Sequence, residues 1–318
     1  MASEFDIIAR FFTRATPQTI LGVGDDAALI MPGNGAELVV STDMLVEGTH
    51  FLPNTNAEKL GWKALAVNLS DLAAMGADPR WATLSLSLPE INESWLADFS
   101  KGFFECAERF GVDLIGGDTT RGPLNISITM MGEVPNGMAL RRNAAQSGDD
   151  IWVTGRLGNA ALGLAALKGE IPQDGLEACI AALHTPQPRI ALGIALRGMA
   201  HAAIDISDGL MADLGHIVKR SRRGADIHLN EIPRSASLSS MMRKPMGMHC
   251  LLAGGDDYEL CFTAPKRHDD RIVALRETLN IPITRIGSIT STTELRLLDG
   301  YGHPIEFNES GYDHFAAT

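Results

Sequence analysis

Short β-rich runs alternate with longer helical patterns along the whole chain, and this alternation restricts the fold to a mixed α/β class. Residues 36–42 (AELVVST) and 81–89 (WATLSLSLP) are typical of strands. Residues 57–77 carry apolar side chains at helical spacing, and Gly76 predicts the C-terminal end of that helix. A second helical pattern covers 93–111, so we expect an α/β domain in this half of the chain.

The length of 318 residues suits two α/β domains rather than one. Residues 135–150 are polar and rich in turn formers, which indicates a break between the domains. A new unit of strand, glycine turn and helix begins directly after this break. We therefore predict a first domain at 1–137, a linker at 138–149 and a second α/β domain at 150–318.

Composition argues against several classes of protein. No apolar run approaches the ~20 residues that span a membrane, and the N-terminus lacks the apolar region of a signal peptide, so we expect a cytoplasmic protein. Four widely spaced cysteines without a Cys-x-x-Cys pair predict buried, reduced thiols. The formal net charge of −12 argues against nucleic-acid binding, and the basic run Lys219–Gly224 is better interpreted as the end of a helix.

The familiar nucleotide-binding motifs are absent. No Gly-x-x-x-x-Gly-Lys-Ser/Thr sequence occurs, so there is no P-loop. Gly22 and Gly24 lack the third glycine of a dinucleotide-binding turn, and the turn at Gly155–Gly158 has the wrong spacing. The protein-kinase motifs His-Arg-Asp and Asp-Phe-Gly are also missing. A chain that handles nucleotides with this sequence must use another device.

Aspartates recur where predicted strands meet turns, which is the usual place of ligands in α/β proteins. They are Asp25, Asp26, Asp43, Asp118, Asp205, Asp208, Asp256 and Asp257. Any one of them could serve only as a turn residue or helix cap. The recurrence favours a hard divalent cation, because Mg²⁺ prefers carboxylate oxygens and bridges them to phosphates. Bound Mg²⁺ would also explain how an acidic protein takes an anionic substrate.

Asp71 differs from these because it lies inside a predicted helix, on the face that carries Leu60 and Val67. Near the C-terminal end of a helix the dipole disfavours an anion by ~0.3–1 kcal/mol. An inward carboxylate in this position needs a partner, and a cation is the simplest one.

Candidate cations for a phosphate group are Arg121 and the pair Arg141–Arg142, although the pair could equally belong to a solvated linker. His50 follows the strand that carries Asp43. Taken alone, this histidine is better interpreted as structural.

The chain contains, in this order, the motifs GVGDDAAL, STDMLVEGTHF, KALAVNLSDLAAMGADP, LIGGDTTRG, AIDISDGLMADLGHI and GGDDYEL, and it closes with GYDHF. Together they resemble the thiamine-monophosphate kinase family, which belongs to the superfamily of aminoimidazole ribonucleotide synthetase, selenophosphate synthetase and a hydrogenase-maturation protein. NLSDLAAMGADP and GGDTTRG are shared across that superfamily, whereas STDMLVEGTHF and GYDHF are more specific to the thiamine enzymes. The resemblance covers nearly the whole chain.

The resemblance implies an N-terminal domain whose sheet pairs with its twin in a homodimer, and a C-terminal domain of mixed sheet covered by helices. ATP and several Mg²⁺ ions would bind in a cleft between the domains. Matched by motif, the magnesium ligands would be Asp26, Ser41, Thr42, Asp43, Asp71, Asp118, Asp205 and Asp208. The residues that contact ATP would be Gly117, Asp118, Arg142 and Ser207, and those near thiamine monophosphate would be His50, Asp256 and Tyr312. Catalysis would depend on Asp43, Asp71, Asp118 and Asp205.

One substrate contact departs from the family pattern. The usual family loop reads Gly-Gly-Glu-Asp-Tyr-Glu-Leu, and this chain has Asp256 in place of the glutamate. The carboxylate is therefore one methylene shorter, which makes Asp256 the least direct of the transferred assignments.

The activity that the resemblance implies is direct transfer of the γ-phosphoryl group of ATP to thiamine monophosphate, assisted by several Mg²⁺ ions. The acceptor oxygen is already anionic at pH 7, so a site rich in aspartate needs no strong general base. Aminoimidazole ribonucleotide synthesis, a metal-dependent phosphatase and a non-catalytic binding module remain as alternatives. No cysteine precedes Cys106 and the chain ends HFAAT, which argues against the selenophosphate and hydrogenase-maturation activities.

Overall fold

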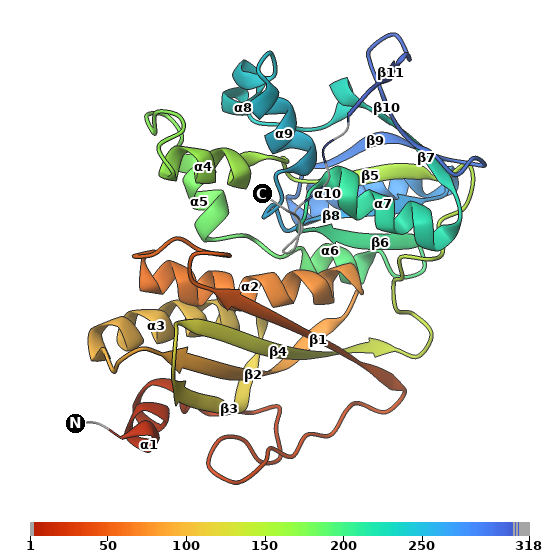
Figure 1. Ribbon diagram of the computed structural model, residues 1–318. Coiled ribbons are helices and arrows are strands. Elements are labelled where there is room, and N and C mark those ends of the chain that lie inside the picture. The colour runs from red at the N-terminus through yellow and green to blue at the C-terminus, as the bar shows by residue number, and fades with distance from the viewer. Residues whose placement is uncertain (1–2, 308, 310, 312–318) are drawn as a thin grey trace. The chain divides into compact units, whose positions relative to one another are not determined.

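The computed structural model describes residues 3–307, 309 and 311, and it confirms the mixed α/β class. The chain divides into two compact units (Figure 1). Unit 1 is the chain up to Leu72 together with Ala77–Gly137, and unit 2 is Ala73–Gly76 together with the chain from Met138 onward. No helix within the described part of the chain is both long and apolar enough to cross a membrane.

Unit 1 is built around a four-stranded sheet in the order β1-β4-β2-β3. The strands are β1 (Ala36–Val46), β2 (Asp78–Leu88), β3 (Asp113–Arg121) and β4 (Asn125–Pro135). β4 runs antiparallel to both β1 and β2, whereas β2 and β3 are parallel. The helices are α1 (Glu4–Ile7), which continues into the π-helical turn η1 (Ile8–Phe12), α2 (Ala57–Ala74) and α3 (Glu93–Phe110).

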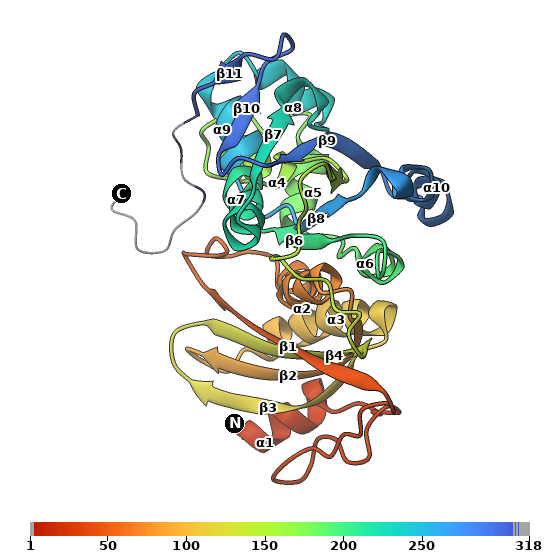
Figure 2. The same ribbon diagram turned by 90° about the vertical axis from the view of Figure 1, so that its right-hand side faces the viewer.

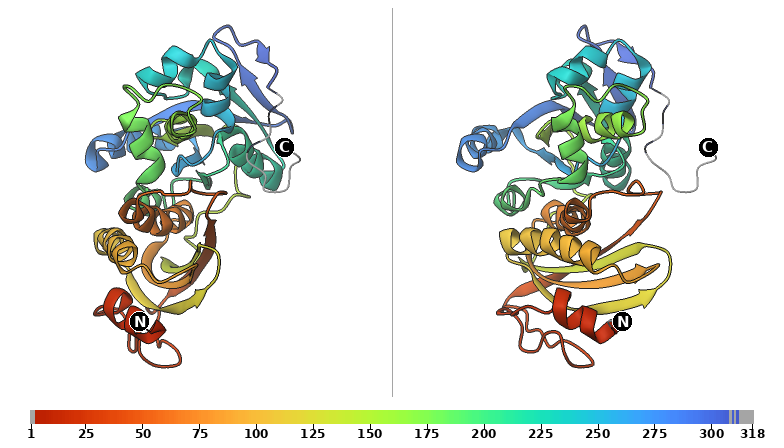
Figure 3. Two further views of the ribbon diagram at one scale, coloured as in Figure 1. Left: turned by 60° about the vertical axis from the view of Figure 1, so that its left-hand side comes forward. Right: turned by 90° about the vertical axis from the view of Figure 1, so that its left-hand side faces the viewer.

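Helices α2 and α3 cover one face of this sheet, as both views in Figure 3 show. The strands follow the alternating rule, because Leu84 and Leu86 on β2 are buried while Ser85 between them is exposed. The two helices approach closely at glycines: a β-carbon on Gly102 would collide with the Glu58 carbonyl of α2. The helix that the sequence predicts at 93–111 ends as expected, with Gly111 in the left-handed conformation.

Unit 2 contains a seven-stranded sheet in the order β11-β10-β7-β9-β5-β8-β6. The strands are β5 (Asp150–Thr154), β6 (Ala202–Ile206), β7 (Gly224–His228), β8 (Glu259–Ala264), β9 (Ile283–Thr290), β10 (Leu295–Leu298) and β11 (Pro304–Ile305). The helices are α4 (Asn159–Leu167), α5 (Glu177–His184), α6 (Ile190–Ala195), α7 (Leu210–Ser221), α8 (Ala236–Met241), α9 (Pro245–Ala253) and α10 (Asp269–Leu279), with 3₁₀ turns η2 (Leu229–Glu231) and η3 (Lys266–His268). The sheet is mixed, since β7 pairs parallel with β10 and antiparallel with β9.

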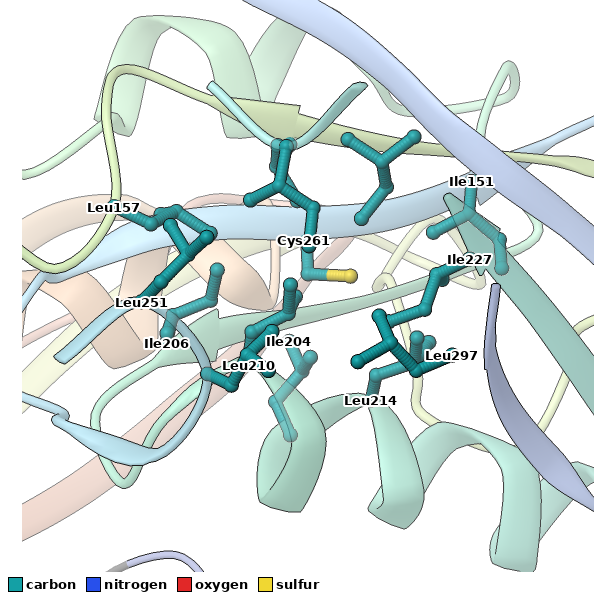
Figure 4. Close-up of a cluster of buried hydrophobic side chains, with 14 of the residues drawn as sticks. Ile151, Leu157, Ile204, Ile206, Leu210, Leu214, Ile227, Leu251, Cys261 and Leu297 are labelled. Atoms are coloured by element: carbon teal, nitrogen blue, oxygen red, sulfur yellow. The ribbon is translucent and has the colours of Figure 1, made fainter. Parts of the chain in front are cut away.

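The main core of unit 2 lies where α4, α7 and α9 pack on the strands. Figure 4 shows Ile204 and Cys261 from the sheet facing Leu210 and Leu214 of α7. Figure 2 shows α6 and α10 on the other side of this sheet from α7 and α9. The basic run after Lys219 ends α7 as predicted, with Arg222 in the left-handed conformation that closes the helix.

All four cysteines are reduced and buried, which confirms the prediction of structural thiols. Burial raises the pKa of the thiol of Cys106, of Cys250 (to about 11) and of Cys261. These thiols therefore stay protonated near neutral pH and are poor nucleophiles.

Candidate functional site

The first group of predicted site residues lies where the edge strand β1 meets α2. The Ser41 hydroxyl donates a hydrogen bond to the Asp71 carboxylate across thirty positions of sequence. Two residues further along β1, the backbone N–H of Asp43 donates to the Asn68 side-chain oxygen at 3.0 Å. The structure therefore brings Ser41, Asp43 and Asp71 together, as the sequence predicts.

Local periodicity explains this grouping. Ser41 and Asp43 are two positions apart on a strand and share a face, while Asn68 and Asp71 are three apart on a helix and share a face. Asp71 points inward, as its place among apolar residues predicts, and its partner in the structure is a hydroxyl. Thr42 points to the opposite face of the sheet, where its hydroxyl lies 2.8 Å from that of Thr129 on β4. Its side chain is therefore separated from the Ser41–Asp71 pair.

Asn68 is a residue of this group that the sequence analysis missed. Its side chain is 1% exposed, and its amide nitrogen donates to the Ala64 carbonyl at 3.0 Å, which leaves the amide oxygen directed at Asp43. A signal was present in the sequence, since Asn68 precedes Asp71 by one helical turn in NLSD.

His50 lies in the turn after β1, and both its backbone and its ring are hydrogen-bonded to Val46. Its Nδ1 accepts a hydrogen bond from the Val46 N–H at 3.0 Å, and its N–H donates to the Val46 carbonyl at 2.9 Å. An accepting Nδ1 requires the neutral ring to carry its proton on Nε2. This arrangement fixes the ring and presents Nε2–H as a donor.

Asp25 and Asp26 lie on the long loop before β1, and both are exposed. Gln18 anchors the start of this loop, because its N–H donates to Asp113 at 2.8 Å. The Asp25 carboxylate accepts the Asp26 N–H at 2.9 Å, so it orders the turn. Asp25 thus has a role in the turn, and the assignment of Asp26 to a metal stays a prediction.

Gly117 and Asp118 lie on β3, at the opposite edge of the sheet from β1. Gly117 has φ +153° and pairs with Leu84, whose carbonyl a β-carbon at 117 would strike, so this position requires glycine. The register runs from Asp43 through Ile128 and Leu84 to Gly117. Three strand spacings separate the ends of this row, about 14 Å. Within one chain the sheet therefore keeps Asp118 away from the Ser41–Asp71 pair.

The second group lies in unit 2, at the end of β6. Asp205 is 3% exposed on the strand, and Ser207 and Asp208 follow it in the loop before α7. Three successive backbone N–H groups of this loop converge on one carboxylate oxygen of Asp213, which the sequence analysis did not single out. Burial raises the pKa of Asp213 to about 7, while the hydrogen bonds from Asp208 and Ser207 act in the opposite direction.

Arg142 belongs to the polar segment before β5 and its side chain is exposed. Ser221 at the end of α7 donates its hydroxyl to the Arg142 carbonyl at 3.1 Å, and the Ala203 N–H of β6 donates to the Arg141 carbonyl at 3.2 Å. The backbone of the arginine pair is therefore anchored beside β6 and α7, and a binding role for the exposed side chains stays a prediction.

The GGDDYEL segment follows α9, and backbone hydrogen bonds connect it to the end of β6 and to the β6–α7 loop. The Asp256 N–H donates to the Ser207 carbonyl and the Tyr258 N–H donates to the Ile206 carbonyl, both at 2.8 Å. Asp257 accepts the Gly158 N–H with both carboxylate oxygens, at 3.0 and 2.8 Å, and burial raises its pKa. Asp256 and Ser207 are thus neighbours, as two members of one site should be. Tyr312 lies outside the described residues.

A largely buried ion pair lies at the end of the GGDDYEL segment, where β8 begins. Arg189 donates to both carboxylate oxygens of Glu259, and the Thr154 hydroxyl donates to the same glutamate at 2.5 Å. Glu259 is the glutamate of GGDDYEL, so its role in the structure is to fix the start of β8. Spacing along the chain could not predict this pairing, since Arg189 is seventy positions away from Glu259.

The donor chemistry of both groups fits magnesium. Ser41, Asp43, Asp71, Asp205 and Asp208 offer only carboxylate and hydroxyl oxygens, the ligands that hard divalent cations prefer. Within the described residues no three histidine, cysteine, aspartate or glutamate side chains form a ready-made metal cluster. Mg²⁺ usually keeps several waters and binds through one or two carboxylates together with substrate phosphates.

Comparisons with known proteins agree with this arrangement. The chain matches two families, AIR synthase related protein, N-terminal domain, over residues 24–134, and AIR synthase related protein, C-terminal domain, over residues 146–300. It is 46% identical over 319 residues to the thiamine-monophosphate kinase of Escherichia coli (strain K12), covering 98% of each chain.

Two solved structures are similar over nearly the whole fold. The thiamine-monophosphate kinase from Stenotrophomonas maltophilia K279a is 47% identical, with a TM-score of 0.85 over 94% of this chain and 95% of that one. AaThiL complexed with AMPPCP and TMP is 31% identical, with a TM-score of 0.79 over 92% of each chain. Full-length identity of this degree, with the aspartate motifs in order, shows that the chain belongs to the thiamine-monophosphate kinase family.

Proposed function

We propose that this chain catalyses the ATP-dependent phosphorylation of thiamine monophosphate to thiamine diphosphate. The observation that carries the proposal is the 46% identity over 98% of the chain to a thiamine-monophosphate kinase. A second relative of the same fold is complexed with AMPPCP, an analogue of ATP, and with TMP. The groups at the ends of β1 and β6 supply the oxygen ligands that such a reaction needs.

The transfer is a single displacement at phosphorus. A terminal phosphate oxygen of thiamine monophosphate forms a bond to the γ-phosphorus of ATP, and the bond from that phosphorus to the β–γ bridging oxygen breaks. The electron pair of the broken bond stays on ADP. Because the attacking oxygen is anionic at neutral pH, no side chain has to remove a proton from it. The protein's task is to hold two polyanions in line against their repulsion.

In unit 1, the residues that would hold magnesium are Asp26, Ser41, Thr42, Asp43, Asp71 and Asp118. In unit 2 they are Asp205 and Asp208. When bound, Mg²⁺ would neutralise phosphate charge and keep the reacting oxygens aligned. Ser41 and Asn68 orient Asp71 and the backbone of Asp43 for this task. Thr42 can contribute only by its backbone, because its hydroxyl points to the other face of the sheet.

The remaining contacts follow from charge and hydrogen-bonding capacity. Arg142, anchored through its backbone to Ser221, would pair with phosphate oxygens of ATP beside Ser207. The thiazolium ring of thiamine monophosphate is cationic, and the Asp256 carboxylate suits a positive group of that kind. The Nε2–H of His50 is a donor of fixed direction for the substrate phosphate.

We further propose that the active form is a homodimer built on the sheet of unit 1. The face of this sheet opposite α2 and α3 carries apolar side chains on β1 that are strongly exposed, namely Leu38 (42%), Val40 (56%) and Met44 (53%). A row of exposed apolar side chains on an edge strand is normally covered by another chain. A second copy is the simplest cover, since most soluble oligomers are symmetric homo-oligomers.

A dimer would also explain how Asp118 can act with Asp43 and Asp71 although it lies at the opposite edge of the sheet. If Asp118 acts with Asp43 and Asp71, the distance across the sheet requires the two sides of the site to come from different copies. The β3 edge of one chain would then complete the site at the β1 edge of its partner. We place this activity in the cytoplasm, in keeping with four reduced cysteines.

The proposal is tested by incubating the purified chain with ATP, Mg²⁺ and thiamine monophosphate and measuring both products. Thiamine diphosphate and ADP should appear in equal amounts. Loss of ATP without thiamine diphosphate would favour the phosphatase alternative, and binding of ATP without turnover would favour a non-catalytic module. Formation of product only with an aminoimidazole ribonucleotide precursor would point to the other superfamily activity.

A further inference from the structure

The loop between β6 and α7 is wrapped around a buried carboxylate that belongs to the helix after it. The N–H groups of Ser207, Asp208 and Gly209 all donate to Oδ2 of Asp213, at 3.0, 3.0 and 3.2 Å. Asp213 is 2% exposed and lies in the first turn of α7. Hydrogen bonds to a carboxylate are about twice as strong as those between neutral groups. Three of them on one oxygen define the path of the loop.

The junction between this loop and α7 has no capping side chain at the N-cap. Gly209 occupies the N-cap position of α7 and has no side chain to bond the first turn. Its φ of +113° and the closeness of Ala253, whose Cα would lie 2.6 Å from a β-carbon at 209, exclude other residues there. Asp213 acts on the other side of this junction: it lies inside the helix and accepts the N–H groups of the loop residues and of the N-cap residue itself.

Both backbone polar groups of Ser207 are hydrogen-bonded. Its N–H donates to Asp213, and its carbonyl accepts the N–H of Asp256 at 2.8 Å. Asp256 has φ +60° and Tyr258 has φ +49°, conformations that residues with side chains rarely adopt and that need backbone hydrogen bonds to persist. One carboxylate thus fixes the β6–α7 loop directly and the Asp256 segment through Ser207.

We propose that Asp213 is a positioning residue of the reaction, which sets Ser207, Asp208 and Asp256 in their working places without touching a substrate. The proposal rests on the proposed function only in taking those three residues as the contacts for ATP, metal and thiamine monophosphate. Displacement of such groups by about 1 Å can cost 10²-fold in rate. A carboxylate that served only as a helix cap would affect stability and leave the kinetics of the folded enzyme unchanged.

The test compares Asp213→Asn with Asp149→Asn in the full-length chain. Asp149 is a matched control, since it is also 2% exposed in unit 2 and accepts a backbone N–H (that of Gln146, at 2.8 Å), and its carboxylate contacts the ring of His201, which is not a predicted site residue. Both variants should unfold at lower temperature than the wild type. Only Asp213→Asn should lower kcat, by about 10²-fold, and raise KM for both ATP and thiamine monophosphate. Wild-type kcat and KM in folded Asp213→Asn would overturn the proposal.

A second measurement does not depend on turnover or on the variant being stable. Amide hydrogen exchange of the wild type should show Ser207, Asp208 and Gly209 protected, although they lie in a loop, and Asp213→Asn should lose this protection. Rapid exchange of these three amides in the wild type would overturn the positioning role of Asp213 even if the chain proves to be a thiamine-monophosphate kinase. Protected amides in a chain without kinase activity would support that role and contradict the proposed function instead.

Discussion

The two aspartate groups of this chain are held in opposite ways. At the β1–α2 edge, Ser41, Asp43 and Asp71 stand on a strand and a helix. The side chains of Ser41 and Asp71 contact each other, and the Asp43 N–H donates to the Asn68 side chain. At the β6–α7 loop, Ser207 and Asp208 stand on irregular backbone, and a buried carboxylate collects their N–H groups. The first group is positioned by regular secondary structure, and the second by a single side chain.

The difference matters for what a substitution does. On rigid elements a change from carboxylate to amide alters charge and leaves the geometry in place. In the loop the same change at the organising residue alters geometry at several site residues together. The comparison therefore separates residues that act on the phosphates from residues that hold others in place.

The largest effect is expected for Asp43→Asn and Asp71→Asn in the rigid group. Each removes a negative oxygen ligand without disturbing β1 or α2, so turnover should fall by about 10³-fold while the unfolding temperature changes little. Steady-state assays over a range of Mg²⁺ concentrations, with thermal unfolding of the same samples, measure both quantities. Near-normal turnover in both variants would contradict the assignment of these aspartates to the metal.

The next effect concerns the two edges of the sheet in unit 1. Coexpressed Asp43→Asn and Asp118→Asn chains should recover about a quarter of wild-type activity, because half of randomly formed dimers are mixed and each mixed dimer has one intact site. Each variant alone should be nearly inactive. The test uses two affinity tags to isolate the mixed dimer. A mixed dimer as inactive as the separate variants would place both aspartates in a site within one chain.

A smaller effect is expected at Asn68, which supports the rigid group. Asn68→Ala removes the side-chain acceptor of the Asp43 N–H and the side-chain hydrogen bond to the Ala64 carbonyl, and should lower the free energy of unfolding by about 1–3 kcal/mol. Denaturant titration checks this loss. Because α2 and β1 remain in place, kcat should fall far less than in Asp43→Asn, and an equal fall would show that the rigid group depends on its support as the loop does.

The smallest effect lies outside both groups, where Asp150 and Asp269 face each other at the start of α10. Oδ2 of Asp150 and Oδ1 of Asp269 are buried without a hydrogen-bond partner among the described residues. Burial and the Asp150 charge raise the pKa of Asp269. The ionised form is thus disfavoured in the folded chain, and stability falls as the pH rises through the raised pKa.

Asp269→Asn removes this penalty and should raise the Tm by about 1–3 °C at pH 8, with a smaller gain at pH 4. Asp270→Asn is the control, because it removes a charge from the same first turn of α10. A gain of equal size in both variants, or a gain independent of pH, would contradict the pairing with Asp150. Activity should stay unchanged, which sets the scale for carboxylates that affect stability alone.

Sequence patterns predicted the secondary-structure elements better than the contacts among their side chains. Periodicity found β1 and α2, and it placed Asp71 inward, because these properties depend on neighbouring residues. The partners Ser41 and Asp71 could not be paired from spacing, since they are thirty positions apart and meet only when β1 packs on α2. Asp118 shows the same limit, because strand order decides its distance from Asp43.

Asp213 could have been found from the sequence. Asp213 lies four positions after Gly209, in the first turn of α7, where an acidic side chain can reach back to N–H groups of the preceding loop. The capping box describes one such bond, from the N-cap N–H back to a helix side chain, whereas three N–H groups converge on Asp213.

The central claim is that the γ-phosphoryl group passes directly from ATP to thiamine monophosphate. ATP labelled at the γ-phosphorus with ³²P tests it most directly, with the wild-type chain and with Asp43→Asn as the matched inactive control. We expect the label in the terminal phosphoryl group of thiamine diphosphate, with one label for each ADP formed. The Asp43→Asn variant should transfer almost none. Label released as inorganic phosphate in the presence of thiamine monophosphate would contradict it.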